Sequence, residues 1–156
     1  MEFLHFTLQA IFFCCCGYHC YTDFKEQLLY DEVSLVMLIS GMLEGIILNK
    51  CSEVFWGGLA IGGVLLLLYI ASRGGMGLGD VKLGVVLGTW LGWQQGLLSI
   101  LFALCLGSIV GVLLIAIRVK TRKDAIPFGP FMCLSGIIML YYGSELLAWY
   151  CKTFNY

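Results

Sequence analysis

Six apolar stretches, separated by short polar connections, constrain the fold of this chain more than any other feature. They lie at about 1–21, 33–48, 54–72, 81–93, 95–117 and 130–150. Of the 156 residues, 60% are hydrophobic and 12% are charged, whereas a soluble domain carries about 25% charged residues. Because a membrane span needs about 20 residues, we expect an all-α, polytopic membrane protein. Its six transmembrane helices would form a single membrane-embedded domain over residues 1–156.

The positions of Lys and Arg favour six crossings, because basic residues gather on the cytoplasmic side of membrane proteins. With the N-terminus outside, the loops on one side hold seven of them, namely Lys25, Arg73, Lys82, Arg118, Lys120, Arg122 and Lys123. The other side holds only Lys50 and Lys152. If the short 81–93 stretch did not cross, the split would be four against five. We therefore expect six spans with both termini outside.

A glycine-rich loop precedes the fourth stretch. It runs Gly74-Gly75-Met76-Gly77-Leu78-Gly79 and ends on Asp80, after which apolar sequence resumes. A carboxylate at the edge of the hydrocarbon is costly, so Asp80 is a candidate functional residue. The loop fits neither the dinucleotide-binding fingerprint nor the P-loop, and we expect no nucleotide or nucleic acid partner.

A second carboxylate, Asp23, ends the first stretch on the same predicted side as Asp80. The intervening residues, 24–79, cross twice and return to the face from which they started. Two carboxylates close together cannot both ionise easily, so they share a proton. The ionised member can act as general base on water, while the protonated member hydrogen-bonds a scissile carbonyl. This chemistry requires no metal and no cofactor.

Two further stretches accompany the Gly77-Leu78-Gly79-Asp80-Val81-Lys82-Leu83 run. They are Asp23-Phe24-Lys25-Glu26-Gln27-Leu28-Leu29-Tyr30-Asp31 and Ile126-Pro127-Phe128-Gly129-Pro130-Phe131. Together the three resemble the type IV prepilin peptidases, the bacterial branch of the GxGD intramembrane aspartic proteases. The resemblance covers nearly the whole chain. It implies a hydrolase of the cytoplasmic (inner) membrane that serves type IV pilus assembly and protein secretion.

The resemblance also implies roles for individual residues. Asp23 and Asp80 would be the two catalytic aspartates. Motif residues that would support them are Gly77, Gly79, Lys82, Pro127 and Gly129. The family closes the segment after its first aspartate with Ile-Pro-Asn or Ile-Pro-Asp, whereas this chain has Leu29-Tyr30-Asp31, so Tyr30 replaces the proline.

The implied substrate is a pilin-like precursor, whose short basic leader stays cytoplasmic while its apolar part enters the bilayer. The chain is similar to the short form associated with tight-adherence (Flp) pili. That form lacks the N-terminal methyltransferase region and its paired zinc-binding cysteines, so cleavage without methylation is expected. The sequence leaves open whether the protein forms a homo-oligomer.

Other polar residues have competing interpretations. Glu26, Asp31 and Glu32 crowd the loop after Asp23, either as solvated charge or to attract a basic leader. Glu44, within the second stretch, is either a buried hydrogen-bonding group or functional. None of the eight cysteines forms a CxxC pair, so we expect them to be small buried residues rather than metal ligands.

A rival class is a non-enzymatic membrane protein, either a small transporter or a pilus or secretion assembly subunit. Asp23 and Asp80 would then form a proton or cation site. Transporters often contain related halves, and no convincing repeat relates residues 1–78 to 79–156. An inactive relative of the peptidases is a third hypothesis, which the presence of both aspartates disfavours.

Overall fold

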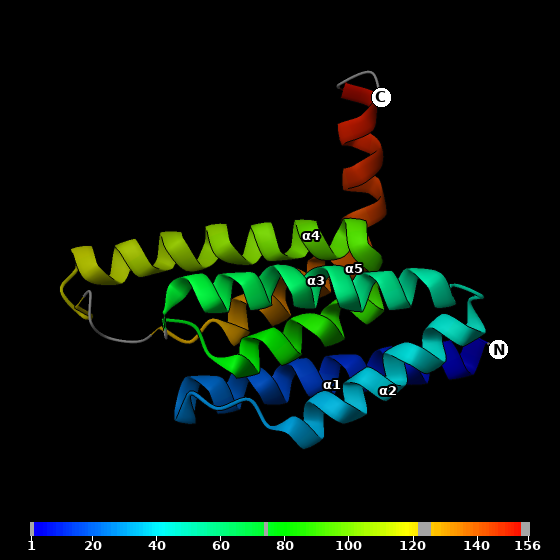
Figure 1. Ribbon diagram of the computed structural model, residues 1–156, viewed down its shortest axis with the longest axis horizontal. Coiled ribbons are helices and arrows are strands. Elements are labelled where there is room, and N and C mark those ends of the chain that lie inside the picture. Colours follow the sequence, from blue (N-terminus) through cyan, green and yellow to red (C-terminus); the bar gives the residue numbers. More distant parts are fainter. Residues whose placement is uncertain (1, 74, 122–125, 154–156) are drawn as a thin grey trace.

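The computed structural model describes residues 2–73, 75–121 and 126–153, and these form five helices joined by short connections (Figure 1). The helices are α1 (Glu2–Glu26), α2 (Asp31–Ile47), α3 (Cys51–Ser72), α4 (Leu78–Ala116) and α5 (Gly129–Thr153). The described ranges contain no strand, so the expected all-α class is confirmed. Gly74, at the start of the glycine-rich loop, lies outside the described residues.

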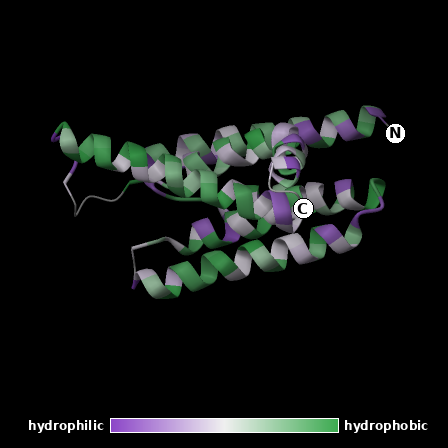
Figure 2. Cartoon of the chain, turned by 90° about the horizontal axis from the view of Figure 1, so that it is seen from above, coloured by the Kyte–Doolittle hydropathy of each residue, from purple (hydrophilic) through white to green (hydrophobic). Residues whose placement is uncertain are grey.

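Apolar side chains cover the helices on all sides, which is typical of helices surrounded by lipid or protein. Outward-facing examples include Leu67, Ile70 and Val112, each more than half exposed. Figure 2 shows hydrophobic residues along the helices and hydrophilic ones mainly towards their ends and connections. Four helices, α1, α3, α4 and α5, are long and apolar enough to cross a membrane. The length and apolar composition of these four helices therefore confirm the expectation of an integral membrane protein.

Six separate membrane helices are not supported. α2 has 17 residues, a length of about 26 Å, which is less than the hydrocarbon thickness of about 30 Å. The expected separate spans at 81–93 and 95–117 form one helical element, α4, of 39 residues. Helical structure resumes directly after Gly92, so the expected interruption is a bend at one residue.

That bend nevertheless reverses the chain. Gly92 has φ 71° and ψ 179°, a conformation that glycine adopts far more readily than other residues. A Cβ built on Gly96 would lie 3.8 Å from the Cα of Gly88, although eight residues of straight helix span about 12 Å. Residues 78–91 and 93–116 of α4 therefore run in opposite directions, as Figure 1 shows.

The first part of α4, residues 78–91, lies at the centre of the packing. A Cβ on either Gly57 of α3 or Gly88 of α4 would collide with the carbonyl oxygen of the other glycine. Small residues at such a contact allow two helix backbones to approach closely. Around it lies a core of buried side chains from all five helices, among them Phe12, Met37, Ile61, Leu83 and Met132.

The glycine contact predicts different effects for two substitutions in α3. Gly57→Ala should lower the free energy of unfolding by about 1–3 kcal/mol, because the added methyl group meets backbone atoms of α4. Gly63 is the matched control, since a Cβ there would meet nothing within 4 Å. Unfolding in mixed detergent micelles measures both variants. Equal stability of Gly57→Ala and Gly63→Ala would contradict the packing described.

Candidate active site

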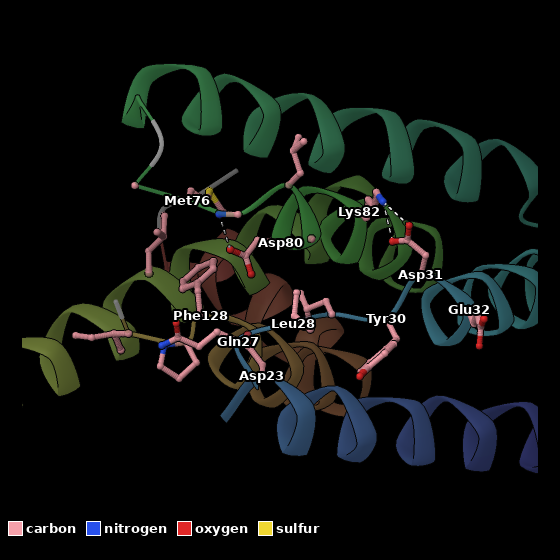
Figure 3. A pocket seen from close by; sticks show the side chains of 18 residues that line it. Asp23, Gln27, Leu28, Tyr30, Asp31, Glu32, Met76, Asp80, Lys82 and Phe128 are labelled. Atoms are coloured by element: carbon pink, nitrogen blue, oxygen red, sulfur yellow. Dashed lines mark hydrogen bonds and ion pairs between the residues drawn. The ribbon is translucent and has the colours of Figure 1, made fainter. Parts of the chain in front are cut away.

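An open cavity of about 950 Å³ lies where α1 ends and where α2 and α4 begin. Its walls come mainly from residues 27–32, 75–82 and 126–128, which are far apart in the sequence. Asp23 and Asp80 both line this cavity. Figure 3 shows their side chains directed into the same space from different helices. The structure therefore brings the two candidate aspartates together at one end of the bundle.

Asp80 is held by the start of its own helix. Gly77 precedes α4 in an extended conformation, and its backbone N–H donates to Asp80 Oδ2 at 3.3 Å. A carboxylate in this position stabilises a helix start, because it accepts from an otherwise unpaired backbone N–H. Gly77 and Gly79 both line the cavity beside Asp80. The glycine-rich loop thus forms one wall of the cavity.

Asp23 is held by a helix from the other end of the chain. It lies in the last turns of α1, which continues to Glu26 rather than ending at residue 21 as expected. Its Oδ2 accepts from the backbone N–H of Gly129, the first residue of α5, at 2.8 Å. The positive end of the α5 dipole also favours a carboxylate there. A Cβ on Gly129 would lie 2.7 Å from that oxygen, which explains glycine at this position.

Leu29 lies between the glycine-rich loop and the start of α5, the two segments that orient the aspartates. A Cβ on Gly79 would lie 3.2 Å from the Leu29 side chain, and one on Gly129 would lie 3.3 Å from it. The 27–30 loop therefore packs against the glycine-rich loop on one side and the start of α5 on the other. Sequence analysis placed Leu29 in the triplet that closes the segment after Asp23 but assigned it no role of its own.

The arrangement places two nearly buried carboxyl groups, 6% and 9% exposed, beside the same open cavity. They are close enough to interact electrostatically. Each is oriented by one backbone N–H, and within residues 2–73, 75–121 and 126–153 neither forms an ion pair with a Lys or Arg. Such a pair can share a proton and hold a water molecule between an acid and a base. No group of three or more potential metal ligands occurs among the described residues.

Lys82, a motif residue, lies at the rim of the cavity, and no hydrogen bond or ion pair joins it to Asp23 or Asp80 among the described residues. Its Nζ donates to both carboxylate oxygens of Asp31, at 2.7 and 2.6 Å (Figure 3). Pro127 also lines the cavity. Glu26 accepts from the Tyr30 hydroxyl at 2.8 Å, and this hydrogen bond raises the pKa of Tyr30 above its ordinary value. Of the three loop acids, Asp31 and Glu32 line the cavity and Glu26 does not.

Tyr30 retains the backbone conformation of the proline that it replaces in the family pattern. It precedes α2 with φ −74° and ψ 125°. Proline fixes φ near −65° within about 15°, so the angle at Tyr30 is one that proline adopts. The substitution therefore leaves the course of the loop after Asp23 compatible with the pattern.

His19 is a buried polar residue that sequence analysis missed. It lies one helical turn before Asp23 and is completely buried. Its Nε2 is 3.3 Å from the hydroxyl of Ser34, in the first turn of α2, and the Ser34 N–H donates to the Tyr30 carbonyl. These contacts tie the start of α2, and with it the end of the 27–30 loop, to α1. An i, i+4 relation to Asp23 was the only sequence signal that could have indicated His19.

Glu44 lies away from the cavity. It is buried, and it forms an ion pair with His5 of α1, a residue to which sequence analysis assigned no role. The pair gives Glu44 a partner that is itself partly exposed, and the second carboxylate oxygen has no hydrogen-bond partner among the described residues. Among the cysteines, Cys15, Cys16 and Cys133 are buried as expected, whereas Cys14, Cys51, Cys105 and Cys151 are exposed.

Comparison with known proteins agrees with this geometry. The sequence profile of the type IV leader peptidase family matches residues 10–112, which include both Asp23 and Asp80. The chain belongs to this family. The Ile126–Phe131 run, which supplies Pro127 and Gly129, lies beyond the matched residues. No solved structure matches the chain with significance.

Several curated members of the type IV leader peptidase family are similar to the chain, and each is named a prepilin leader peptidase/N-methyltransferase. The Legionella pneumophila protein is 32% identical over 83% of this chain and 48% of its own length. The Aeromonas salmonicida strain A449 protein is 34% identical, over 85% and 48%. The Pseudomonas putida protein is 34% identical, over 81% and 46%. The chain spans about half the length of the curated relatives it matches.

The His19–Ser34 contact predicts a stability effect. Ser34→Ala should lower the free energy of unfolding by about 1–3 kcal/mol, because it leaves a buried imidazole nitrogen without its partner. Ser72→Ala is the control, since the Ser72 hydroxyl bonds Tyr69 at an exposed position, and its effect should stay within about 0.5 kcal/mol. Unfolding in mixed micelles measures both. A difference smaller than the experimental error would contradict a structural role for this contact.

Proposed function

We propose that this chain is a membrane aspartic endopeptidase that removes the leader peptide from type IV pilin-like precursors. The observation that carries the proposal is the meeting of Asp23 and Asp80 in one cavity, beside the glycine-rich loop. The membership of the type IV leader peptidase family supports the same reaction. A short basic leader is the substrate segment that the family resemblance implies.

In the proposed reaction, the ionised aspartate removes a proton from a water molecule, and the resulting hydroxide attacks the scissile carbonyl carbon. The protonated aspartate donates a hydrogen bond to the carbonyl oxygen and then gives its proton to the leaving amine. The C–N bond then breaks, and the C–O bond formed with the water oxygen remains in the new carboxyl group. The reaction needs no metal and no covalent intermediate with the enzyme. The backbone N–H groups of Gly77 and Gly129 keep the two carboxyl groups oriented while the proton moves.

The open cavity supports access by an extended peptide. A peptide bond must leave its helix before water can attack it, so the substrate needs room beside the two aspartates. Residues 75–79 form one wall of the cavity, and their glycines allow backbone adjustments that other residues resist. The cavity opens at the end of the bundle, where the substrate chain would leave the bilayer.

We further propose that the chain crosses the inner membrane six times, with the cavity at the cytoplasmic face and both termini outside. The reversal at Gly92 supports two crossings by α4. α2 can approach the required length when the apolar residues Leu28, Leu29 and Leu48 at its flanks are included. The excess of Lys and Arg at the cavity end of the bundle supports this orientation.

The orientation of α4 can be tested with single cysteines in an otherwise cysteine-free chain in bacterial inner membranes. Gln94→Cys, just after the reversal, should react with a membrane-impermeant maleimide added from outside, because six crossings place it at the outer surface. Gly75→Cys should react only after the membrane is opened. Protection of residue 94 from both sides would instead indicate that α4 crosses once.

The catalytic assignment predicts the loss of processing in two variants. Asp23→Asn and Asp80→Asn should each reduce the rate of leader removal at least about a hundredfold, because each removes one half of the acid–base pair. Glu53→Gln is the control, since Glu53 is exposed at the far end of α3 from the cavity. The measurement is the size shift of a co-expressed pilin precursor. Processing at the wild-type rate in either variant would remove that aspartate from the mechanism. Absence of processing by the wild-type chain as well would count against the peptidase function or the chosen precursor.

A further inference from the structure

The ion pair between Lys82 and Asp31 lies at the entrance of the aspartate cavity, and the proposed hydrolysis does not use it. Lys82 is two residues after Asp80 on α4, and Asp31 is the first residue of α2. Both side chains line the cavity. The two residues are 51 positions apart in the sequence, so the pair connects two helices across the rim.

The geometry at Asp31 is suited to a cationic side chain. The Lys82 ammonium donates to both carboxylate oxygens, at 2.7 and 2.6 Å. Asp31 therefore already accepts a group of the same chemistry as a lysine of a substrate. Glu32, the next residue, also lines the cavity and has no hydrogen bond or ion pair among the described residues.

Exposure makes this pair exchangeable. The side chains of Lys82 and Asp31 are 54% and 69% exposed. Ion pairs at such positions contribute little net stability, because water solvates both charges and two long side chains must be held still. A second ammonium or guanidinium group can therefore take the place of Lys82 with a small loss of free energy.

The pair is not needed to hold α2 against α4. Deeper in the bundle, the Trp90 indole N–H of α4 donates to the Met37 carbonyl of α2 at 2.9 Å. The same indole packs against Gly41, where an added Cβ would lie 2.7 Å from it. These buried contacts fix the two helices independently of the rim. A role in substrate selection thus explains the position of the ion pair better than a role in helix packing.

We propose that Asp31 is a specificity-determining residue that binds a basic side chain of the substrate leader, and that Lys82 occupies Asp31 until the substrate displaces it. The inference rests on the proposed peptidase function, since it assigns the basic leader to this part of the same cavity. A general attraction by acidic residues would depend on no single carboxylate. Here Asp31 alone binds the basic side chain, and Lys82 competes with that side chain for it. Glu26, which accepts from the Tyr30 hydroxyl and does not line the cavity, has no part in it.

The direct test is peptide binding to the full chain in a neutral detergent, in an Asp80→Asn background that keeps the peptide intact. One fluorescent peptide carries two lysines before a Gly-Phe junction, and its twin carries two glutamines instead. Asp31→Asn should weaken binding of the lysine peptide about five- to tenfold and leave the glutamine peptide unchanged. Lys82→Met should strengthen binding of the lysine peptide about threefold, because the competitor is removed. High salt should reduce both effects.

Glu53→Gln is the matched control, since the Lys50–Glu53 pair is similarly exposed, 57% on each side, at the far end of α3. It should leave both affinities unchanged. The proposal is overturned if Asp31→Asn weakens both peptides equally, if Lys82→Met weakens the lysine peptide, or if neither peptide binds. Lys82→Met keeps the test decisive should Asp31→Asn fail to fold.

Cleavage of matched precursors separates this proposal from the proposed function. With an intact aspartate pair, Asp31→Asn should raise KM for a precursor with a basic leader while kcat stays within about twofold. If the wild-type chain cleaves neither precursor but the peptides still discriminate, the peptidase function fails and the subsite stands. If both precursors are cleaved and Asp31→Asn changes neither KM, the subsite fails and the peptidase function stands.

Discussion

The close contact between α3 and the first part of α4 determines where the rest of this structure can lie. At Gly57 and Gly88 the two backbones touch, and the space that a single methyl group would need is already filled. Other helices approach residues 78–91 in the same way, with Gly41 of α2 beside Trp90 and Gly136 of α5 beside Leu87. Since Asp80 lies at the end of this central segment, its position depends on glycine packing several turns away.

Much of the fold could be predicted from apolar length alone. The stretch expected at 54–72 corresponds to α3 at Cys51–Ser72, and the stretch at 130–150 to α5 at Gly129–Thr153. The prediction was less successful where the backbone conformation of a single residue determines the path of the chain. An apolar run reports how much chain can be buried, but it does not show that Gly92 alone reverses the direction of α4. Nor does it show that α1 continues through Asp23 to Glu26.

The candidate site, too, could be predicted only in part. That Asp23 and Asp80 could meet followed from counting crossings, and the structure brings both to one cavity. The resemblance implied that Gly77 and Gly129 support the aspartates, but the hydrogen bonds by which they do so could not be foreseen, because a backbone N–H has no signature in the sequence. The same holds for the ion pair of Lys82 with Asp31 and for His5 with Glu44, which join distant parts of the chain. The replacement of proline by Tyr30 departs from the family pattern but leaves a φ angle that proline could adopt.

The hydrogen bond from Gly129 to Asp23 also bears on how the site forms during synthesis. The two residues are 106 positions apart, and Gly129 begins the last helix. Because chains are made and inserted from the N-terminus, Asp23 enters the membrane long before the group that orients it has been synthesised. Both aspartates can be present in a growing chain while the cavity still lacks the start of α5. The site can therefore be assembled only after Gly129 has left the ribosome, and a chain that has not yet reached this residue cannot hold its acid–base pair in the arrangement described.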